Sequence, residues 1–348
     1  MVRLRTTSPT QPGWTRRRAG RGFVYLDRDG ARLVGADALR CKELVIPPAW
    51  RDVWICPWPN GHLQAVGTDD ASRRQYLYHP QWRLQRDAAK HDRVLVVAAR
   101  LPQARDRVVE HLGLPGMPRE RALATAFRLL DLGFFRIGGE SYAEQNGSYG
   151  LATIGKEHVR TEGSSVVFEY TAKSGKERYV ALANADVLDC VTLLRRRRSG
   201  SQKLLAYREG SRWHDISSSD INEYVKTVVG GKISAKDFRT WHATVLAAVA
   251  LAVSTHTVAS PTARKRAIAR AMREVSDYLG NTPAVCRASY VDPRVVDLFE
   301  DGVTIEHALR TLGEQTPVGQ PATHGPVEQA VLRMLRRAPS SSGRATRR

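Results

Sequence analysis

The sequence predicts an α+β fold, with a small β-rich N-terminal domain followed by a mostly α-helical domain that contains one small β-hairpin or sheet. Short apolar runs separated by turn residues fill positions 21–86, whereas longer runs with helix-capping residues fill positions 87–313. The 348 residues are enough for two ordinary domains. The strands predicted in the first domain are Phe23–Leu26, Asp52–Cys56, His62–Val66 and Arg74–Tyr78, separated by turn signals such as Asp29-Gly30 and Asn60-Gly61.

Helix start and stop signals define the second domain. Asn184 is a typical N-cap residue, and Ser234 begins a capping box with Asp237. Gly230 and Gly280 stand where a helix C-terminus favours glycine. The predicted helices are Pro118–Leu132, Asn184–Arg195, Asp220–Val229, Ser234–Val253 and Thr262–Leu279, and the predicted hairpin pairs Ser164–Tyr170 with Arg178–Leu182.

Both ends of the chain are basic. Residues 1–20 contain arginines and prolines but no acidic residue, which predicts a disordered arm. Residues 314–348 are rich in Pro, Ser, Gly and Arg, which predicts a basic tail with one candidate short helix, Val327–Arg337. We therefore expect the folded part of the chain to lie between these segments.

The formal net charge is +19, from 54 Lys and Arg against 35 Asp and Glu. Residues 1–22 contribute +6 and residues 314–348 contribute +4, so the rest of the chain still carries +9. Such a surface attracts polyanions, chiefly nucleic acid or an acidic membrane. No run of about 18 apolar residues occurs, and the N-terminal arginines precede no apolar signal core, so we expect no membrane span.

No motif for a cofactor or metal is evident. The four cysteines are widely scattered without a CxxC pair, which indicates neither a zinc ribbon nor a disulfide framework, and favours a reducing compartment. Ser174-Gly175-Lys176 is followed by Glu177, where a phosphate-binding P-loop needs Ser or Thr. HExxH and EF-hand patterns are also absent. We expect no cofactor and no metal.

Four segments carry polar residues that are informative as a set: Phe135–Leu151, Phe168–Lys176, Ala235–His242 and Tyr278–Tyr290. In chain order they supply Arg136, Lys173, Arg239, Asn281 and Tyr290. Each residue alone has an ordinary explanation, such as a solvated cation, an ion pair or a half-buried tyrosine with a satisfied hydroxyl. Only their combination, together with the sequence around each of them, points to chemistry.

That combination resembles the type IB DNA topoisomerases, especially their short poxvirus-like and bacterial members, from about Val24 to Leu298. The most specific segments are Lys-Asp-Phe-Arg-Thr-Trp (236–241), Asn-Gly-Ser-Tyr-Gly-Leu (146–151) and Leu-Gly-Asn-Thr-Pro-Ala-Val (279–285) with a tyrosine nine residues past its Asn. The resemblance implies that the catalytic set is Tyr290 as nucleophile, Lys173 as general acid, and Arg136, Arg239 and Asn281.

The resemblance also implies the chemistry. Two arginines and an amide can bind the non-bridging oxygens of a phosphodiester as charge builds up on them, in place of a metal ion. A tyrosine with a pKa near 10 is only about 0.1% ionised at pH 7, and the arginines favour its phenolate. A lysine protonates the leaving 5′-oxygen. The 3′-phosphotyrosyl ester retains the bond energy, so the strand can rotate and be resealed without ATP.

Double-stranded DNA is the implied partner, enclosed by the two domains of a monomer acting as a clamp. Gln75–Tyr78 and Ile46–Trp50 match the family's N-terminal domain, and the residues expected to contact DNA are Gln75, Tyr76, Tyr78, Tyr142 and Lys236. The residues around Phe168 and Tyr170 resemble the family's sequence pattern, which implies that Lys173, and not its neighbour Lys176, is the acid. Many members have His where this chain has Asn281, and this change predicts a modest loss of transition-state binding because an amide still donates a hydrogen bond.

Two alternatives remain open. A tyrosine recombinase uses the same covalent chemistry, but that group usually has His at the position of Lys236 and a Leu-Gly-His where this chain has Asn281. A non-catalytic basic DNA-binding protein would suit the charge but would not need the five-residue set. We expect a cytoplasmic location at a bacterial nucleoid, although the basic runs Arg16–Arg18 and Arg195–Arg198 leave a nuclear location open.

Overall fold

The computed structural model describes residues 3–255, 260–312 and 324–338, without the side chains of residues 141, 142, 311 and 312. The chain forms two compact units, Met1–Lys90 and His91–Arg348. The division between them falls inside helix α2 (Pro80–Ala98), which also contains the expected boundary between Arg86 and Asp87.

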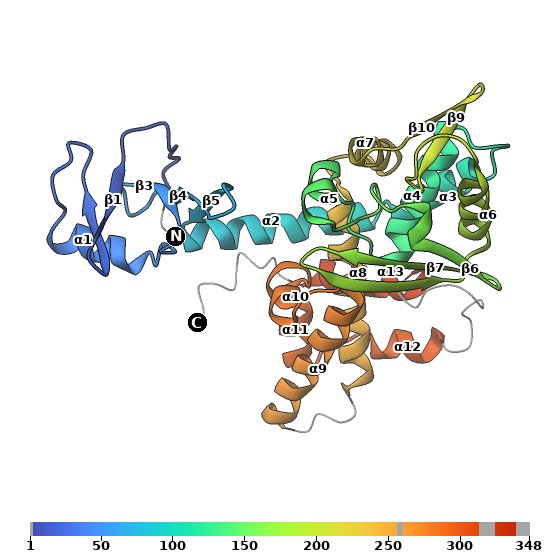
Figure 1. The fold of residues 1–348 in the computed structure, drawn as a ribbon. Helices are drawn as coiled ribbons and strands as arrows, with labels where there is room; N and C mark the ends of the chain where they lie inside the picture. The colour runs from blue at the N-terminus through green and yellow to red at the C-terminus, as the bar shows by residue number, and fades with distance from the viewer. Residues whose placement is uncertain (1–2, 256–259, 313–323, 339–348) are drawn as a thin grey trace. The chain divides into compact units, whose positions relative to one another are not determined.

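The N-terminal unit is built on a five-stranded antiparallel sheet with the order β2-β1-β3-β4-β5 (Figure 1). Its elements are β1 (Trp14–Ala19), β2 (Gly22–Leu26), α1 (Gly35–Glu43), β3 (Arg51–Ile55), β4 (Leu63–Thr68) and β5 (Arg74–Tyr78). Its core consists of Tyr25, Cys41, Ile46, Val53, Ile55 and Ala65. All four strands expected here are present to within two residues at either end, and the structure adds β1 and α1.

The expectation of a disordered arm over residues 1–20 is wrong for its described part. Strand β1 pairs with both β2 and β3, and Trp14 packs against the core. Arg16 donates hydrogen bonds of 2.9 Å to the carbonyl of Ile46 and 2.8 Å to that of Trp50. A run of arginines resembles a solvated arm in composition, but alternation along a strand turns Trp14 and Arg16 inward while Thr15 and Arg17 stay exposed.

The second unit is mainly helical, so the expected α+β fold is confirmed. Its helices are α3 (Leu101–Leu112), α4 (Arg119–Gly133), α5 (Glu140–Asn146), α6 (Ala185–Arg196), α7 (Ser218–Val229), α8 (Ala235–Val253), α9 (Pro261–Leu279), α10 (Pro283–Ser289), α11 (Pro293–Glu300), α12 (Glu306–Leu312) and α13 (Pro326–Arg337), with a 3₁₀ turn at Lys156–His158. Strands β6 (Val159–Glu162), β7 (Ser165–Ala172) and β8 (Lys176–Leu182) form an antiparallel sheet, and β9 (Ala206–Glu209) pairs with β10 (Arg212–Asp215).

Helix α8 is the central element of this unit. It contacts α4, α7, α9, α11, α12 and α13 (Figure 1), and its Phe238 and Trp241 are almost completely buried. The capping box expected at its start is present, since Asp237 Oδ2 accepts a hydrogen bond of 2.8 Å from the backbone N–H of Ser234. The helix that carries Arg239 is therefore fixed at its first turn and along most of its surface.

The C-terminal expectation is corrected in part. The bounds of helix α13 agree with the candidate short helix to within one residue. The helix does not belong to a loose tail, however, since Val331 and Leu335 are completely buried in the main core. Glu328 accepts hydrogen bonds of 2.6 Å from Arg105 and 2.5 Å from the indole of Trp241. The polar and arginine-rich composition conceals an apolar stripe at helical spacing. The expected tail beyond Ala338 lies outside the described residues.

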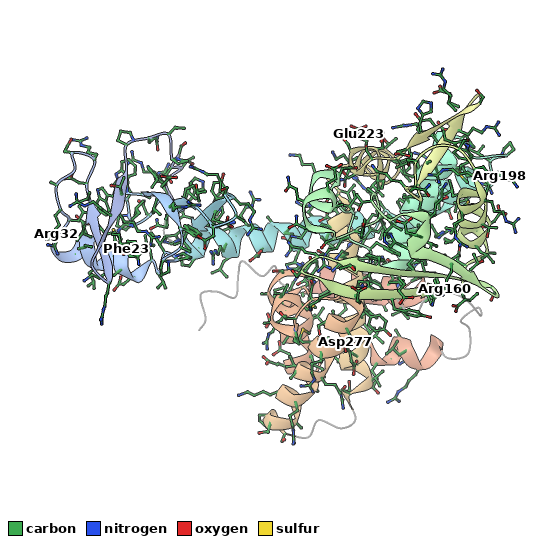
Figure 2. The ribbon with its side chains drawn as sticks, in the orientation of Figure 1. Phe23, Arg32, Arg160, Arg198, Glu223 and Asp277 are labelled. Carbon is green, nitrogen blue, oxygen red and sulfur yellow. The ribbon has the colours of Figure 1, made fainter. Side chains whose placement is uncertain are left out.

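The two basic runs are divided between structural and exposed roles. Arg197 is 7% exposed and donates hydrogen bonds to the carbonyls of Leu194 and Leu204, whereas its neighbour Arg198 is exposed at the rim of this unit (Figure 2). The guanidinium of Arg16 in the first run likewise donates hydrogen bonds to backbone carbonyls.

Among the described helices, none combines the length and the hydropathy that a membrane span needs.

Candidate active site

The loop after α4 positions Arg136. Phe134 ends the helix in the left-handed conformation (φ 56°), a strained choice for a residue with a side chain. The carbonyl of Arg136 then accepts a 2.8 Å hydrogen bond from Leu151 N–H. Gly138 and Gly150 touch so closely that a Cβ on Gly150 would lie 2.5 Å from Gly138 N. The segment around Arg136 and the segment around Gly150 are therefore held against each other by a backbone hydrogen bond and by close glycine packing.

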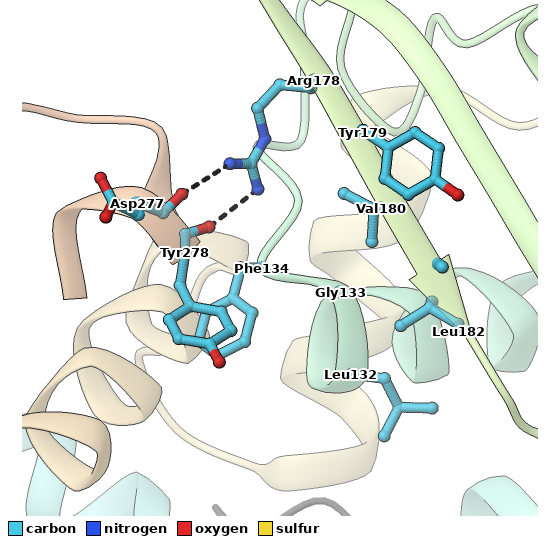
Figure 3. A pocket seen from close by; sticks show the side chains of 10 residues that line it. Leu132, Gly133, Phe134, Arg178, Tyr179, Val180, Leu182, Asp277 and Tyr278 are labelled. Carbon is cyan, nitrogen blue, oxygen red and sulfur yellow. Dashed lines mark hydrogen bonds between the residues drawn. The ribbon is translucent and has the colours of Figure 1, made fainter. Parts of the chain in front are cut away.

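The turn between α9 and α10 positions Asn281. Gly280 ends α9 in the left-handed conformation (φ 62°), as the sequence predicts. Arg178 of β8 donates hydrogen bonds of 3.1 Å to the carbonyl of Asp277 and 2.8 Å to that of Tyr278, which are visible in Figure 3. Asn281 Oδ1 accepts a hydrogen bond from Arg136. Two separate arginines thus hold the turn that presents the amide.

Arg239 connects these two loops from α8. It is 3% exposed, and its guanidinium donates hydrogen bonds to the carbonyl of Phe134 and, at 2.8 Å, to that of Leu279. The guanidinium carbon lies 5.3 Å from the centre of the Tyr290 ring. The second arginine is therefore held by the same two loops that carry Arg136 and Asn281.

Tyr290 is half-buried at the C-terminal end of α10. Its backbone carbonyl accepts a 3.3 Å hydrogen bond from Thr244 Oγ1, which in turn accepts one of 3.1 Å from Asp292 N–H. Thr244 lies one turn and a half after Arg239 on α8. One helix therefore positions both the arginine and the backbone of the tyrosine.

The charges around Tyr290 favour its ionised form. Burial would raise the pKa of its hydroxyl, but the charge and a hydrogen bond of Arg239, with the charges of Lys236 and Arg136, bring the pKa below its usual value. Burial, together with the neighbouring charge of Arg136, lowers the pKa of Arg239 to about 10, so it stays cationic at neutral pH. The site thus has an excess of positive charge that an anion would relieve.

Two buried donors of the site have no hydrogen-bond partner among the described residues: Arg239 Nε and Asn281 Nδ2. The Asn281 amide does lie near the Cys286 thiol, where it helps offset the rise in the thiol's pKa that burial causes, but a thiol is a weak acceptor. Buried donors without partners are costly, and they are typical of a site that a ligand completes.

The structure thus brings four of the five expected catalytic residues together: Arg136, Arg239, Asn281 and Tyr290. Lys173 is exposed on the β7–β8 turn, where Ser174 and Gly175 both have positive φ, and within the described chain no hydrogen bond or ion pair joins it to the other four. Lys176 belongs to β8 and pairs with Ala172. The assignment of Lys173 stays a prediction.

The residues expected to contact DNA are placed as follows. Lys236 is exposed, with Nζ 5.9 Å from the centre of the Tyr290 ring. Tyr76 and Tyr78 stack on each other along β5, with ring centres 6.2 Å apart, whereas the Gln75 amide donates a 2.8 Å hydrogen bond to Asp69. The Tyr142 side chain lies outside the described residues. DNA contact by these residues stays a prediction.

The sequence does not single out Arg178, apart from its place in the predicted hairpin. Its partners are backbone carbonyls about 100 residues away, so no local pattern indicates its role. Beside it lies a cavity of about 340 Å³ between β8, Phe134 and Tyr278 (Figure 3). The one cluster with metal-ligand spacing among the described residues is elsewhere, at Asp131, His242 and His324.

Comparison with known proteins agrees with this geometry. Residues 79–308 match the family described as eukaryotic DNA topoisomerase I, catalytic core, and residues 22–69 match the bacterial DNA topoisomerase IB N-terminal domain. The chain is 28% identical to DNA topoisomerase 1B of Acanthamoeba polyphaga mimivirus over 303 residues, which cover 85% of this chain and 90% of the relative. It is 20% identical to DNA topoisomerase 1B of vaccinia virus (strain Copenhagen) over 237 residues, 68% of this chain and 72% of the relative.

The match to the catalytic core covers the helical unit in which Arg136, Arg239, Asn281 and Tyr290 come together, and it assigns the chain to the class of type I DNA topoisomerases. Within that class, the matches to both the catalytic core and the N-terminal domain show that the chain belongs to the type IB DNA topoisomerases. It is therefore a DNA topoisomerase of type I, and DNA is its partner.

Proposed function

We propose that this enzyme relaxes supercoiled duplex DNA by cutting one strand with Tyr290, holding the 3′-phosphate as a phosphotyrosine while the free end rotates, and then resealing the strand. The observation that carries the proposal is the convergence of Arg136, Arg239 and Asn281 around Tyr290, with two buried donors left unpaired. A scissile phosphate placed there gives Arg239 Nε and Asn281 Nδ2 the acceptors that they lack.

The charges of the site account for the reaction without a metal or ATP. The phosphorane-like transition state carries extra charge on its non-bridging oxygens, which Arg136 and Arg239 stabilise as cationic donors. The lowered pKa of Tyr290 makes its oxygen a better nucleophile near neutral pH. Because the phosphotyrosyl ester conserves the energy of the broken bond, the 5′-hydroxyl can attack it directly and displace the tyrosine.

Lys173 completes the proposed mechanism as general acid. Its exposed position on the β7–β8 turn suits a side chain that reaches the leaving 5′-oxygen only when DNA is bound. The same hairpin is tied to the site at the third residue pair from its turn, where Arg178 of β8, which pairs with Tyr170, binds the end of α9. Lys173 can therefore move at the tip while the hairpin stays anchored.

We further propose that the enzyme acts as a monomer that clamps duplex DNA with its two units. The stacked Tyr76 and Tyr78 of β5 and the exposed Lys236 of α8 are the groups we expect to face the duplex. The net charge of +19 supports tight, salt-sensitive binding. The location that we propose is the cytoplasm, on chromosomal DNA.

The deciding experiment incubates supercoiled plasmid with the protein in EDTA and without ATP, and follows relaxation and, after denaturation, covalent attachment. We expect relaxation of positive and negative supercoils, and protein attached to 3′ ends only. Strict dependence on added magnesium, or attachment to 5′ ends, would contradict the mechanism. Relaxation that requires a tetramer would favour the recombinase alternative.

A further inference from the structure

Asp131, His242 and His324 form a cluster that shares no residue with the Tyr290 site. Asp131 on α4 is 1% exposed, His242 on α8 is completely buried, and His324 lies just before α13. Nε2 of His242 lies 3.3 Å from Asp131 Oδ1, and Nε2 of His324 lies 3.2 Å from the same atom. One possible ligand atom of each residue lies within 4.8 Å of the other two.

These contacts do not have hydrogen-bond geometry. Neither ring nitrogen of His242 or His324 has a hydrogen-bond partner among the described residues, although all four nitrogens are buried. When a ring nitrogen lies close to a carboxylate oxygen without the alignment of a hydrogen bond, the lone pairs of both atoms can point at one shared centre, such as a metal ion. Zinc bonds of about 2.0–2.1 Å at tetrahedral angles place neighbouring ligand atoms about 3.3 Å apart, which agrees with both distances.

The charge of the cluster also favours a cation. Arg105 pairs with both Asp131 and Glu328, so this one guanidinium is shared by two buried carboxylates.

The surroundings provide support and access for an ion. Arg105 donates hydrogen bonds of 2.8 Å to Asp131 Oδ2 and 3.0 Å to Oδ1, which orients the carboxylate as the outer partners of metal ligands do. A cavity of about 400 Å³ opens beside His324, and its lining includes Arg105, Arg128, Asn184 and Glu328. It offers an entry path and room for a water molecule at the fourth position.

We infer that Asp131, His242 and His324 bind one Zn²⁺ ion, with water as the fourth ligand, and that this ion fastens α13 to α4 and α8. Two imidazoles and one carboxylate are a donor set that suits Zn²⁺. The ion takes no part in strand cleavage, because the cluster shares no residue with the Tyr290 site. It lies near that site, however, since the His242 ring is 5.6 Å from that of Phe134, whose carbonyl binds Arg239.

The test uses the full-length protein, freed of metal by a chelator and then titrated with Zn²⁺ by calorimetry without DNA. We expect one Zn²⁺ per chain, and a rise of about 4–5 °C in the midpoint of thermal unfolding when free Zn²⁺ is 100 times its Kd. Co²⁺ in its place should give the visible absorption of a tetrahedral site.

The His324→Ala variant should bind Zn²⁺ at least about 100-fold more weakly, because loss of an outer partner alone costs 10–100-fold. The matched control is His214→Ala, which removes a partly exposed histidine of β10 and should bind like the original protein. Absence of stoichiometric binding, or equal binding by His324→Ala, would overturn the zinc site. In either case a proton on one histidine would be the cation that balances Asp131. Plasmid relaxation is measured separately, so its failure would count against the role of Tyr290 and not against the zinc site.

Discussion

Replacement of Asn281 tests whether its amide binds the scissile phosphate. Oδ1 accepts a hydrogen bond from Arg136, and Nδ2 is a buried donor without a partner among the described residues. Asn281→Ala removes the free donor and the acceptor of Arg136. Asn281→Asp keeps the acceptor but replaces the donor with a negative charge, and Asn281→His restores a donor.

The expected magnitudes follow from this geometry. Loss of one donor to a developing oxyanion costs about 10²–10³ in rate, so Asn281→Ala should cleave DNA that much more slowly. A carboxylate about 4 Å from the phosphate adds a repulsion of about 4 kcal/mol at an effective dielectric constant near 20, equivalent to about 10³ in rate. Its pairing with Arg136 offsets part of that repulsion but also withdraws charge from the phosphate. Asn281→Asp should therefore be slower than Asn281→Ala.

The assay is single-turnover cleavage of an end-labelled duplex at saturating enzyme, so that the measured rate excludes binding. Asn281→His should remain within about tenfold of the original rate, since it keeps a donor to phosphate. DNA affinity and thermal unfolding of each variant serve as controls for binding and folding. An Asn281→Ala rate within threefold of the original, or an Asn281→Asp rate equal to that of Asn281→Ala, would refute the assigned role.

The remaining predictions concern Tyr290, the hairpin lysines and α13. Tyr290→Phe should bind DNA almost normally but form no covalent adduct on denaturing gels, and residual relaxation would point to another nucleophile. Lys173→Ala should slow cleavage by about 10²–10⁴ and be rescued by a 5′-bridging sulfur, which leaves without a proton, whereas rescue of Lys176→Ala instead would reassign the acid. Because the pKa of Tyr290 is lowered, the cleavage rate should reach half its maximum below pH 10, and Arg239→Ala should move that midpoint upward; an unchanged midpoint would contradict this. Glu328→Ala should destabilise the protein by about 3–5 kcal/mol in urea unfolding, because it leaves buried partners unpaired, and a loss under 1 kcal/mol would argue against the docked α13.

The sequence alone determined the elements whose signals are local. Asn184 accepts a hydrogen bond from Val187 N–H as an N-cap should, and Gly280 ends α9 in the left-handed conformation. These features depend on hydrogen bonds within a few residues or on the freedom of glycine, so residue type nearly specifies them. The expected catalytic set also came from the sequence, but only through family resemblance, since none of its residues stands out alone.

Tertiary structure decided what depends on partners far along the chain. Composition predicts a disordered arm where strand β1 lies and a basic tail where helix α13 lies, because it does not show that Trp14 and Val331 find apolar neighbours in the folded protein. The carbonyls that anchor Arg239 come from Phe134 and Leu279, more than 100 residues before it and 40 residues after it. No local pattern could bring Asp131 to His242 and His324, because the spacing of metal ligands is informative only when one helix or turn carries them. Buried charges and unpaired donors exist only once the core has closed around them, since it is the exclusion of water that gives them their energy.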